Sequence, residues 1–127
     1  MMKSSQPSPL ELQVLSVLWA DGPSTVREVL DRLPDGRSRA YTTVLSVLQT
    51  MEAKALVSRR TGNKAHVYKF KKTENQILPL LVKNLTTNVF GGSSAKLIET
   101  ALKAGSLTVS EKKQLQEQIK AHKPIHD

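Results

Sequence analysis

The chain of 127 residues has no cysteine, few aromatic side chains and no long apolar run. Without cysteine it can form no disulfide, thiolate metal site or thiol redox sensor. Residues 1–9 lack the apolar segment of a secretion signal, and no stretch reaches the length of a membrane span. We therefore expect a cytoplasmic protein with no membrane partner. Because aromatics make up only 4% of the chain, its core must consist mostly of Leu and Val, and a second chain is expected to cover apolar surface.

Acidic residues are missing from one stretch of the sequence. The whole chain carries 19 Lys and Arg against 11 Asp and Glu, a net charge of +8. Between Lys54 and Lys72 there are seven basic residues and no acidic one. A local positive field of this kind favours an anionic partner.

A two-faced helix is predicted just before this basic stretch, from about Arg39 to Lys54. On a wheel of about 100° per residue, one side gathers the side chains expected in a core: Tyr41, Val44, Leu45, Leu48, Met51 and Ala55. The opposite side gathers Arg39, Thr42, Ser46, Gln49, Thr50 and Ala53. Short polar side chains let a helix approach base edges in the major groove of DNA. The alternative is an ordinary amphipathic helix with a solvated face.

Two shorter helices are expected before this helix and a hairpin after it. The capping boxes Ser8–Glu11 and Thr25–Glu28 begin the two helices, and Gly/Pro segments end them. Strands are expected at 56–60 and 65–70, joined by a turn at 61–64. Three short helices closed by a two-stranded hairpin form a winged helix. The expected fold is therefore mainly α with a small β-hairpin, and its DNA-binding domain comprises residues 1–73.

Residues 74–127 are expected to form three short amphipathic helices. With so few large side chains they can hardly build a core of their own, so we interpret them as a helical dimerisation region. The alternative is that they fold back on the winged helix in a monomer. The residues expected in the dimer interface are Ile77, Leu81, Leu85, Val89, Leu97, Ile98, Leu102, Leu115 and Ile119.

Several segments, in order along the chain, resemble the penicillinase-repressor (BlaI/MecI-like) family. They are residues 8–15, 17–19, 25–30 and 40–45, and Phe90-Gly91-Gly92-Ser93 in the C-terminal half. The resemblance covers most of residues 8–120 and implies a dimeric winged-helix repressor that binds a palindromic operator and blocks transcription. Some members are inactivated by proteolysis at an Asn-Phe bond, triggered by a membrane sensor protease, and others through a copper-responsive cysteine cluster. Here Thr100-Ala101 aligns with that bond and there is no cysteine, so the DNA-binding half transfers and the induction mechanism does not.

DNA contacts are expected from two elements. Hydroxyls on the third helix can donate or accept hydrogen bonds, so no base preference follows from them, whereas Arg39 suits a phosphate or a bidentate contact with guanine. Basic side chains of the hairpin suit phosphates, and each phosphate neutralised adds about −0.9 to the slope of log K against log salt. The candidate DNA-contacting residues are Arg39, Tyr41, Thr42, Thr43, Ser46, Arg59, Arg60, Asn63 and Lys64.

No catalytic or metal-binding pattern stands out in the sequence. His122 and His126 have the i, i+4 spacing of a metal pair, but Pro124 lies between them and no third ligand is near. We expect no enzyme activity, no metal and no cofactor. The expected partners are an operator in double-stranded DNA, a second copy of the chain, and an unidentified inducer, which is a sensor protease or another signal.

The sequence therefore predicts a homodimeric, sequence-specific DNA-binding transcriptional repressor. Two alternatives from other classes stay open at this point. One is a nonspecific architectural DNA-binding protein. The other is a protein-interaction module built on a winged helix, whose basic hairpin would face an acidic protein.

Overall fold

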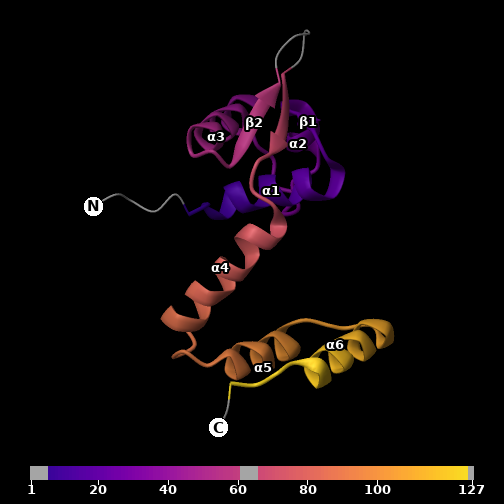
Figure 1. The fold of residues 1–127 in the computed structure, drawn as a ribbon. Helices are drawn as coiled ribbons and strands as arrows, with labels where there is room; N and C mark the ends of the chain where they lie inside the picture. Colours follow the sequence, from indigo (N-terminus) through magenta and orange to yellow (C-terminus); the bar gives the residue numbers. More distant parts are fainter. Residues whose placement is uncertain (1–5, 61–65, 126–127) are drawn as a thin grey trace, which may run out of the picture. The chain divides into compact units, whose positions relative to one another are not determined.

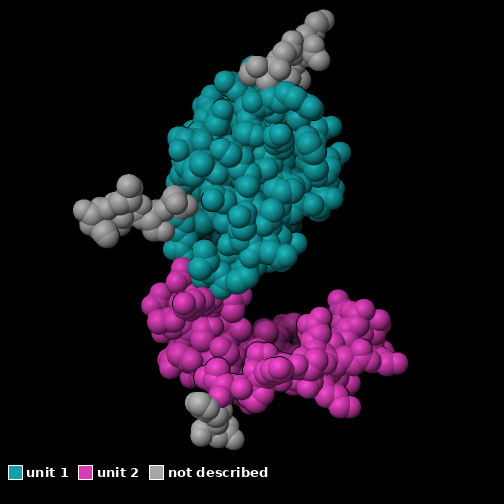
Figure 2. Space-filling model, viewed as in Figure 1, with its two compact units in different colours: residues 1–80 teal, residues 81–127 magenta. Residues whose placement is uncertain are grey.

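The N-terminal part of the chain contains both helices and strands, and the described elements after Phe70 are all helices (Figure 1). The structure is a computed structural model that describes residues 6–60 and 66–125. In these ranges the elements are α1 (Pro9–Asp21), β1 (Ser24–Thr25), α2 (Val26–Asp31), α3 (Tyr41–Ala53), β2 (Val57–Arg60), β3 (Val67–Phe70), α4 (Glu74–Asn88), α5 (Ser94–Ala104) and α6 (Val109–Ala121). The chain is divided into two compact units, residues 1–80 and residues 81–127 (Figure 2). The expected fold class, mainly α with a small β-hairpin, is confirmed.

Local hydrogen bonds explain where α1 and α2 begin. The Ser8 hydroxyl accepts from the Glu11 amide at 3.2 Å, and the Ser8 amide donates to Glu11 Oε1 at 2.9 Å. Thr25 and Glu28 repeat this arrangement at 3.1 and 2.9 Å. Each capping box satisfies two amides that the helix itself leaves unpaired. α3 differs, because its N-cap is Ala40, which has no side-chain hydrogen bond to offer.

The sheet is antiparallel, with β3 in the centre and the strand order β1-β3-β2. In β2, Val57 pairs with Phe70 and Arg60 with Val67. On the other edge, Ser24 of β1 pairs with Tyr68. The sequence predicts only the hairpin, because a strand as short as β1 shows no periodicity. The predicted turn at 61–64 lies outside the described residues.

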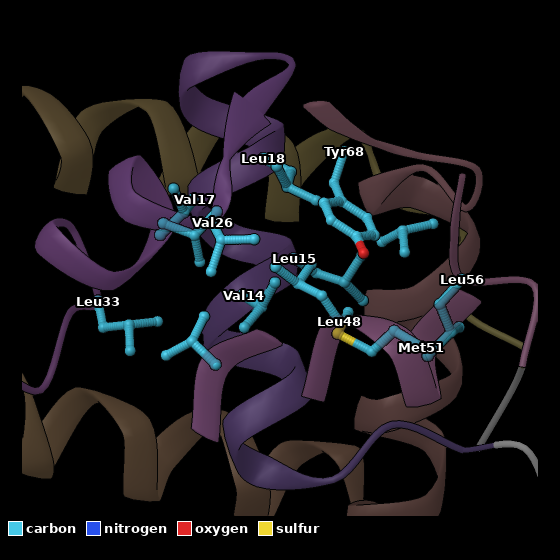
Figure 3. Close-up of a cluster of buried hydrophobic side chains, with 13 residues drawn as sticks. Val14, Leu15, Val17, Leu18, Val26, Leu33, Leu48, Met51, Leu56 and Tyr68 are labelled. Atoms are coloured by element: carbon cyan, nitrogen blue, oxygen red, sulfur yellow. The ribbon is translucent and has the colours of Figure 1, made fainter. Parts of the chain in front are cut away.

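The hydrophobic core of the first unit draws on α1, α2, α3 and the sheet (Figure 3). Its buried members are Val14, Leu15, Val17, Leu18, Val26, Val29, Leu33, Val44, Leu48, Met51, Leu56, Val57 and Tyr68. As expected, most of them are Leu or Val. The helical spacing of the α3 members puts them on one face, so the other face of α3 stays free.

The helical wheel was wrong for two residues that it placed on the core side of α3. Tyr41 is exposed, because it occupies the first turn, at the end of the helix. Ala55 is exposed because the helix ends at Ala53, and Ala55 then adopts the left-handed conformation with φ of 62°. A helical wheel assumes that every residue lies in a helix that packs against a core along its whole length, so it misplaces residues at the ends of the helix.

The C-terminal unit has almost no buried side chain. α4 begins in the first unit, where Ile77 packs against the core, and ends in the second. Of the described residues from 81 to 125, only Thr86 is buried. The exposed large apolar side chains of this unit are Val82, Leu85, Val89, Ile98, Leu102, Leu107, Val109, Leu115, Ile119 and Ile125. A single copy of the chain therefore builds no hydrophobic core in this described part.

Candidate nucleic-acid interface

The free face of α3 carries short hydroxyl side chains. Thr42, Thr43 and Ser46 are exposed; Thr42 and Ser46 lie opposite the buried Val44 and Leu48, and Thr43 lies at the edge of the buried face. Their hydroxyls make no hydrogen bond to another residue in the part of the chain that the structure describes. Donors and acceptors on this face are therefore available to a ligand, and the buried face holds the helix on the core.

The ring of Tyr41 lies beside α2 at the start of this face. The guanidinium of Arg27 lies over the ring, with its carbon 5.5 Å from the ring centroid. An exposed cation–π contact of this kind contributes about 0.5–1 kcal/mol. It links the two helices of the helix-turn-helix at the end where a DNA-reading helix approaches the bases. Sequence reasoning missed Arg27, because no sequence spacing connects it with Tyr41.

Arg39 does not present a free guanidinium. Its Nη1 and Nη2 donate to Oδ1 and Oδ2 of Asp35 at 2.9 and 2.8 Å. The Asp35 carboxylate also accepts from the Arg37 amide and from the Gln13 side chain, each at 3.0 Å. These bonds, that from Arg39 foremost, hold the pKa of Asp35 well below its usual range, and Asp35 in turn raises the pKa of Arg39. The two residues are four apart in the sequence, but the segment between them is not helical, so the helical i, i+4 rule does not predict the pair.

The hairpin exposes two arginines at the end of β2. Arg59 lies opposite Tyr68 and Arg60 opposite Val67. Because successive side chains of a strand point to opposite faces, Arg59 shares the side of the sheet that Tyr68 presents to the core and α3, and Arg60 points to the other side. The two other candidate wing residues, Asn63 and Lys64, lie outside the described residues.

One lysine of the acid-free basic stretch is already paired. The ammonium of Lys54 lies 2.9 Å from Oε1 of Glu11. Its charge is therefore compensated within the protein. The positive surface that follows α3 depends on the basic residues from Arg59 onward.

The described residues contain neither a metal-binding cluster nor a membrane-spanning helix. Across residues 6–60 and 66–125, no three side chains of His, Cys, Asp or Glu are grouped so that they could hold a metal ion. His122 is the C-cap of α6, while His126 is not among the described residues. None of the described helices has the length and apolarity needed to cross a bilayer.

Comparison with known proteins bears on the whole chain. The family described as penicillinase repressor matches residues 7–121. The proteins named "Transcriptional regulator BlaI" from two strains of Mycobacterium tuberculosis, ATCC 25618 / H37Rv and CDC 1551 / Oshkosh, are each 41% identical to this chain over 69 residues. The matched region is 54% of this chain and 50% of theirs, so the chain spans about half the length of these curated relatives. Since the family match covers nearly the whole chain, the protein belongs to the penicillinase-repressor family.

Proposed function

We propose that the protein is a sequence-specific DNA-binding transcriptional repressor that acts in the cytoplasm as a homodimer on a palindromic operator. The observation that carries this proposal is the free hydroxyl face of α3, opposite a buried face and followed by a basic hairpin. Family membership supports it, and so does the transcriptional role in the name of the curated relatives. The proposed molecule is not an enzyme and needs no cofactor.

The proposed reading surface is the first half of α3. Thr42, Thr43 and Ser46 would meet base edges in the major groove, with Tyr41 at the margin of the contact. Phosphates would be bound by the wing, through Arg59, Arg60, Asn63 and Lys64. Arg39 would reach DNA only by exchanging its bonds with Asp35 for bonds with a phosphate or a base.

The apolar side chains of the C-terminal helices support the homodimer. Val89 and Ile119 are each 65% exposed in the single chain and Leu102 is 53% exposed. Burying such surface against a second copy stabilises by about 25 cal/mol per Å². The same argument extends to the remaining members of the proposed interface, which are Leu81, Leu85, Leu97, Ile98 and Leu115. Ile77 is the exception, since it already packs against the N-terminal core.

A two-fold dimer would present two copies of α3 to DNA. Two-fold symmetry in the protein matches a palindrome in the operator, with half-sites about one helical turn or a multiple of it apart. Joining the two reading helices makes binding bivalent, which raises affinity without any new contact. The proposed domain organisation follows from this: residues 1–73 bind DNA and residues 74–127 dimerise.

The test is binding of the full chain to the duplex upstream of its own gene, measured by gel shift and footprinting at about 0.15 M salt. We expect a protected region with two-fold symmetry and a clear preference over a random duplex. Binding with a steep salt dependence but no footprint would show a nonspecific architectural protein. A protein-interaction module would bind neither duplex. Either result contradicts the proposal.

A further inference from the structure

The segment that leads from α2 into α3 has little backbone support. The Arg32 amide donates to the Val29 carbonyl at 3.1 Å and the Gly36 amide to the Leu33 carbonyl at 3.2 Å. The amides of residues 38–40 make no backbone hydrogen bond in the described ranges. Ala40 adds no side-chain cap. The first turn of α3 is closed only by the bonds from the Thr43 and Val44 amides to the Ala40 carbonyl, at 3.1 and 3.4 Å, and the backbone that leads into Ala40 is fixed neither by its own amides nor by a cap.

Asp35 supports this segment through hydrogen bonds to Gln13 of α1, which lies earlier in the chain. The Gln13 amide nitrogen donates to Oδ2 of Asp35 at 3.0 Å, and the Asp35 amide donates to Oε1 of Gln13 at 3.3 Å. Gln13 precedes Val14 and Leu15, two fully buried members of the core. Asp35 is therefore anchored to α1 at two points, through its carboxylate and through its backbone amide, and α1 cannot move without disturbing the core.

The same carboxylate also reaches forward, to the residue before the N-cap of α3. Arg39 binds it with both terminal nitrogens, and the arginine side chain is only 15% exposed. A bidentate pair of this kind fixes direction as well as distance. Because Arg39 is directly bonded to Ala40, the pair restrains the backbone from which the first turn of α3 departs.

We propose that Asp35 is a positioning residue for DNA recognition, which holds Arg39 and thereby sets the first turn of α3, with Thr42 and Thr43, against the base edges. This inference rests on the proposed DNA-binding function. If Asp35 has this role, Arg39 contributes to DNA binding through its pair with Asp35 and makes no phosphate contact of its own.

The negative charge of Asp35 makes a positioning role and the alternative roles predict opposite changes in DNA affinity when Asp35 is replaced. An aspartate near DNA repels phosphates, so an Asp35 without a positioning role weakens binding, and its removal strengthens binding to any sequence. If Asp35 only competes with DNA for Arg39, its removal releases a cation and again strengthens binding. A positioning role predicts the opposite for the correct sequence, which is a loss.

The experiment uses the full chain with Asp35→Asn, Arg39→Ala, Arg39→Lys and the double variant Asp35→Asn/Arg39→Ala. Asp31→Asn and Arg37→Ala are the matched controls, because they make the same charge changes at exposed neighbouring residues. The probes are the duplex upstream of the protein's own gene and a random duplex of equal length, each titrated over a range of salt concentrations. Thermal melting of every variant is recorded alongside.

We expect Asp35→Asn to lower affinity for the upstream duplex about 10-fold, a coupling of the size found for residues in one network, with no loss on the random duplex. Arg39→Ala and Arg39→Lys should lose as much, because a lysine cannot form the bidentate pair. The double variant should lose no more than either single variant. The slope of log K against log salt should be unchanged in all four variants. The two controls should show no loss of specificity.

Four results would overturn the inference. The first is higher affinity of Asp35→Asn for both duplexes, and the second is full affinity in Arg39→Lys. A salt slope shallower by about 0.9 in Arg39→Ala would show a direct phosphate contact. Equal losses on both duplexes, together with a lower melting temperature, would show a purely structural role. If the unaltered protein does not prefer the upstream duplex, the proposed function fails, and that failure is visible before any variant is compared.

Discussion

Lys54 and Glu11 join the end of α3 to the first turn of α1. The Lys54 ammonium lies 2.9 Å from Oε1 and 3.1 Å from Oε2 of a carboxylate that is almost fully buried. The same Oε1 accepts from the Ser8 amide in the capping box. One side chain therefore serves both as the cap of a core helix and as the anchor for the last turn of the proposed reading helix.

Replacing Lys54 by Met should destabilise the fold. The substitution keeps most of the aliphatic stem but leaves a buried carboxylate without its counter-ion, which we expect to cost about 2 kcal/mol. Urea unfolding of the full chain at fixed protein concentration measures the change. Lys71→Met is the control, because Lys71 is exposed and makes no ion pair among the described residues. Equal stability of the two variants would contradict a structural role for the pair.

Replacing Ala55 by Gly should stabilise the protein. The helix ends with the Leu56 amide bonded to the Met51 carbonyl and the Ala55 amide to the Glu52 carbonyl, which is a Schellman motif with alanine at its left-handed position. Relief of the strain at positive φ outweighs the extra chain entropy of glycine, and we expect a net gain of about 0.5–1 kcal/mol.

Ala53→Gly is the matched control for this prediction. Ala53 is the last residue of the same helix and has no positive φ, so glycine there should lower stability, by about 0.5 kcal/mol or more. The two glycine substitutions, two residues apart, should therefore shift the unfolding midpoint in opposite directions. A loss of stability in both would show that the left-handed conformation of Ala55 carries no strain.

Replacing Tyr68 by Phe should leave stability unchanged or raise it slightly. The Tyr68 hydroxyl is buried and has no hydrogen-bond partner in the described ranges (Figure 3), so its removal forfeits no bond of the usual value of about 1 kcal/mol. A decrease of that size in chemical unfolding at pH 7 would indicate that the hydroxyl is satisfied.

The same residue makes stability depend on alkaline pH. Burial raises the pKa of Tyr68 above its ordinary value of about 10. Above that pH the unfolded chain releases the phenolic proton while the folded chain retains it, so stability falls as the pH rises. In Tyr68→Phe this part of the decline should disappear, whereas in Tyr41→Phe it should persist.

Replacing Ile119 by Asp should dissociate the proposed dimer. A carboxylate in the middle of an apolar interface is left without a partner, and its burial is costly. Sedimentation should show a dimer for the unaltered chain at micromolar concentration and a monomer for the variant. Ile125→Asp is the control, because Ile125 is 91% exposed and lies beyond the end of α6. A monomeric unaltered chain would refute the assignment of the C-terminal helices.

Replacing Arg59 by Ala should reduce the salt dependence of DNA binding more than replacing Arg60. The two side chains point to opposite faces of β2, and Arg59 lies on the face that the core and α3 share. We expect the slope of log K against log salt to become shallower by about 0.9 in Arg59→Ala, which is the loss of one phosphate contact. Equal effects of the two substitutions would contradict this prediction and would indicate that Arg59 and Arg60 contact phosphates to the same extent.

Local signals in the sequence predict a large share of this fold. Capping boxes depend on residues three apart, and α3 presents Val44, Leu48 and Met51 on one face because of its own periodicity. The features that were missed depend on tertiary contacts. Gln13 and Asp35 are distant in the chain, Arg27 meets Tyr41 only after two helices have packed, and β1 becomes a strand only because β3 lies beside it. The candidate DNA-binding residues remain predictions, and Arg39 is the one whose expected role the structure changes most.

The described C-terminal helices bury only Thr86, and this has a consequence for how the protein responds to its own abundance. In the proposed homodimer, helices that lack a core in one copy would draw their stability from the second copy, so that folding of this region and pairing of the chains would be a single equilibrium. Dilution would then remove structure as well as the partner chain. Operator occupancy should consequently rise more steeply than in proportion to the number of chains in the cell, so that repression sets in over a narrow range of expression.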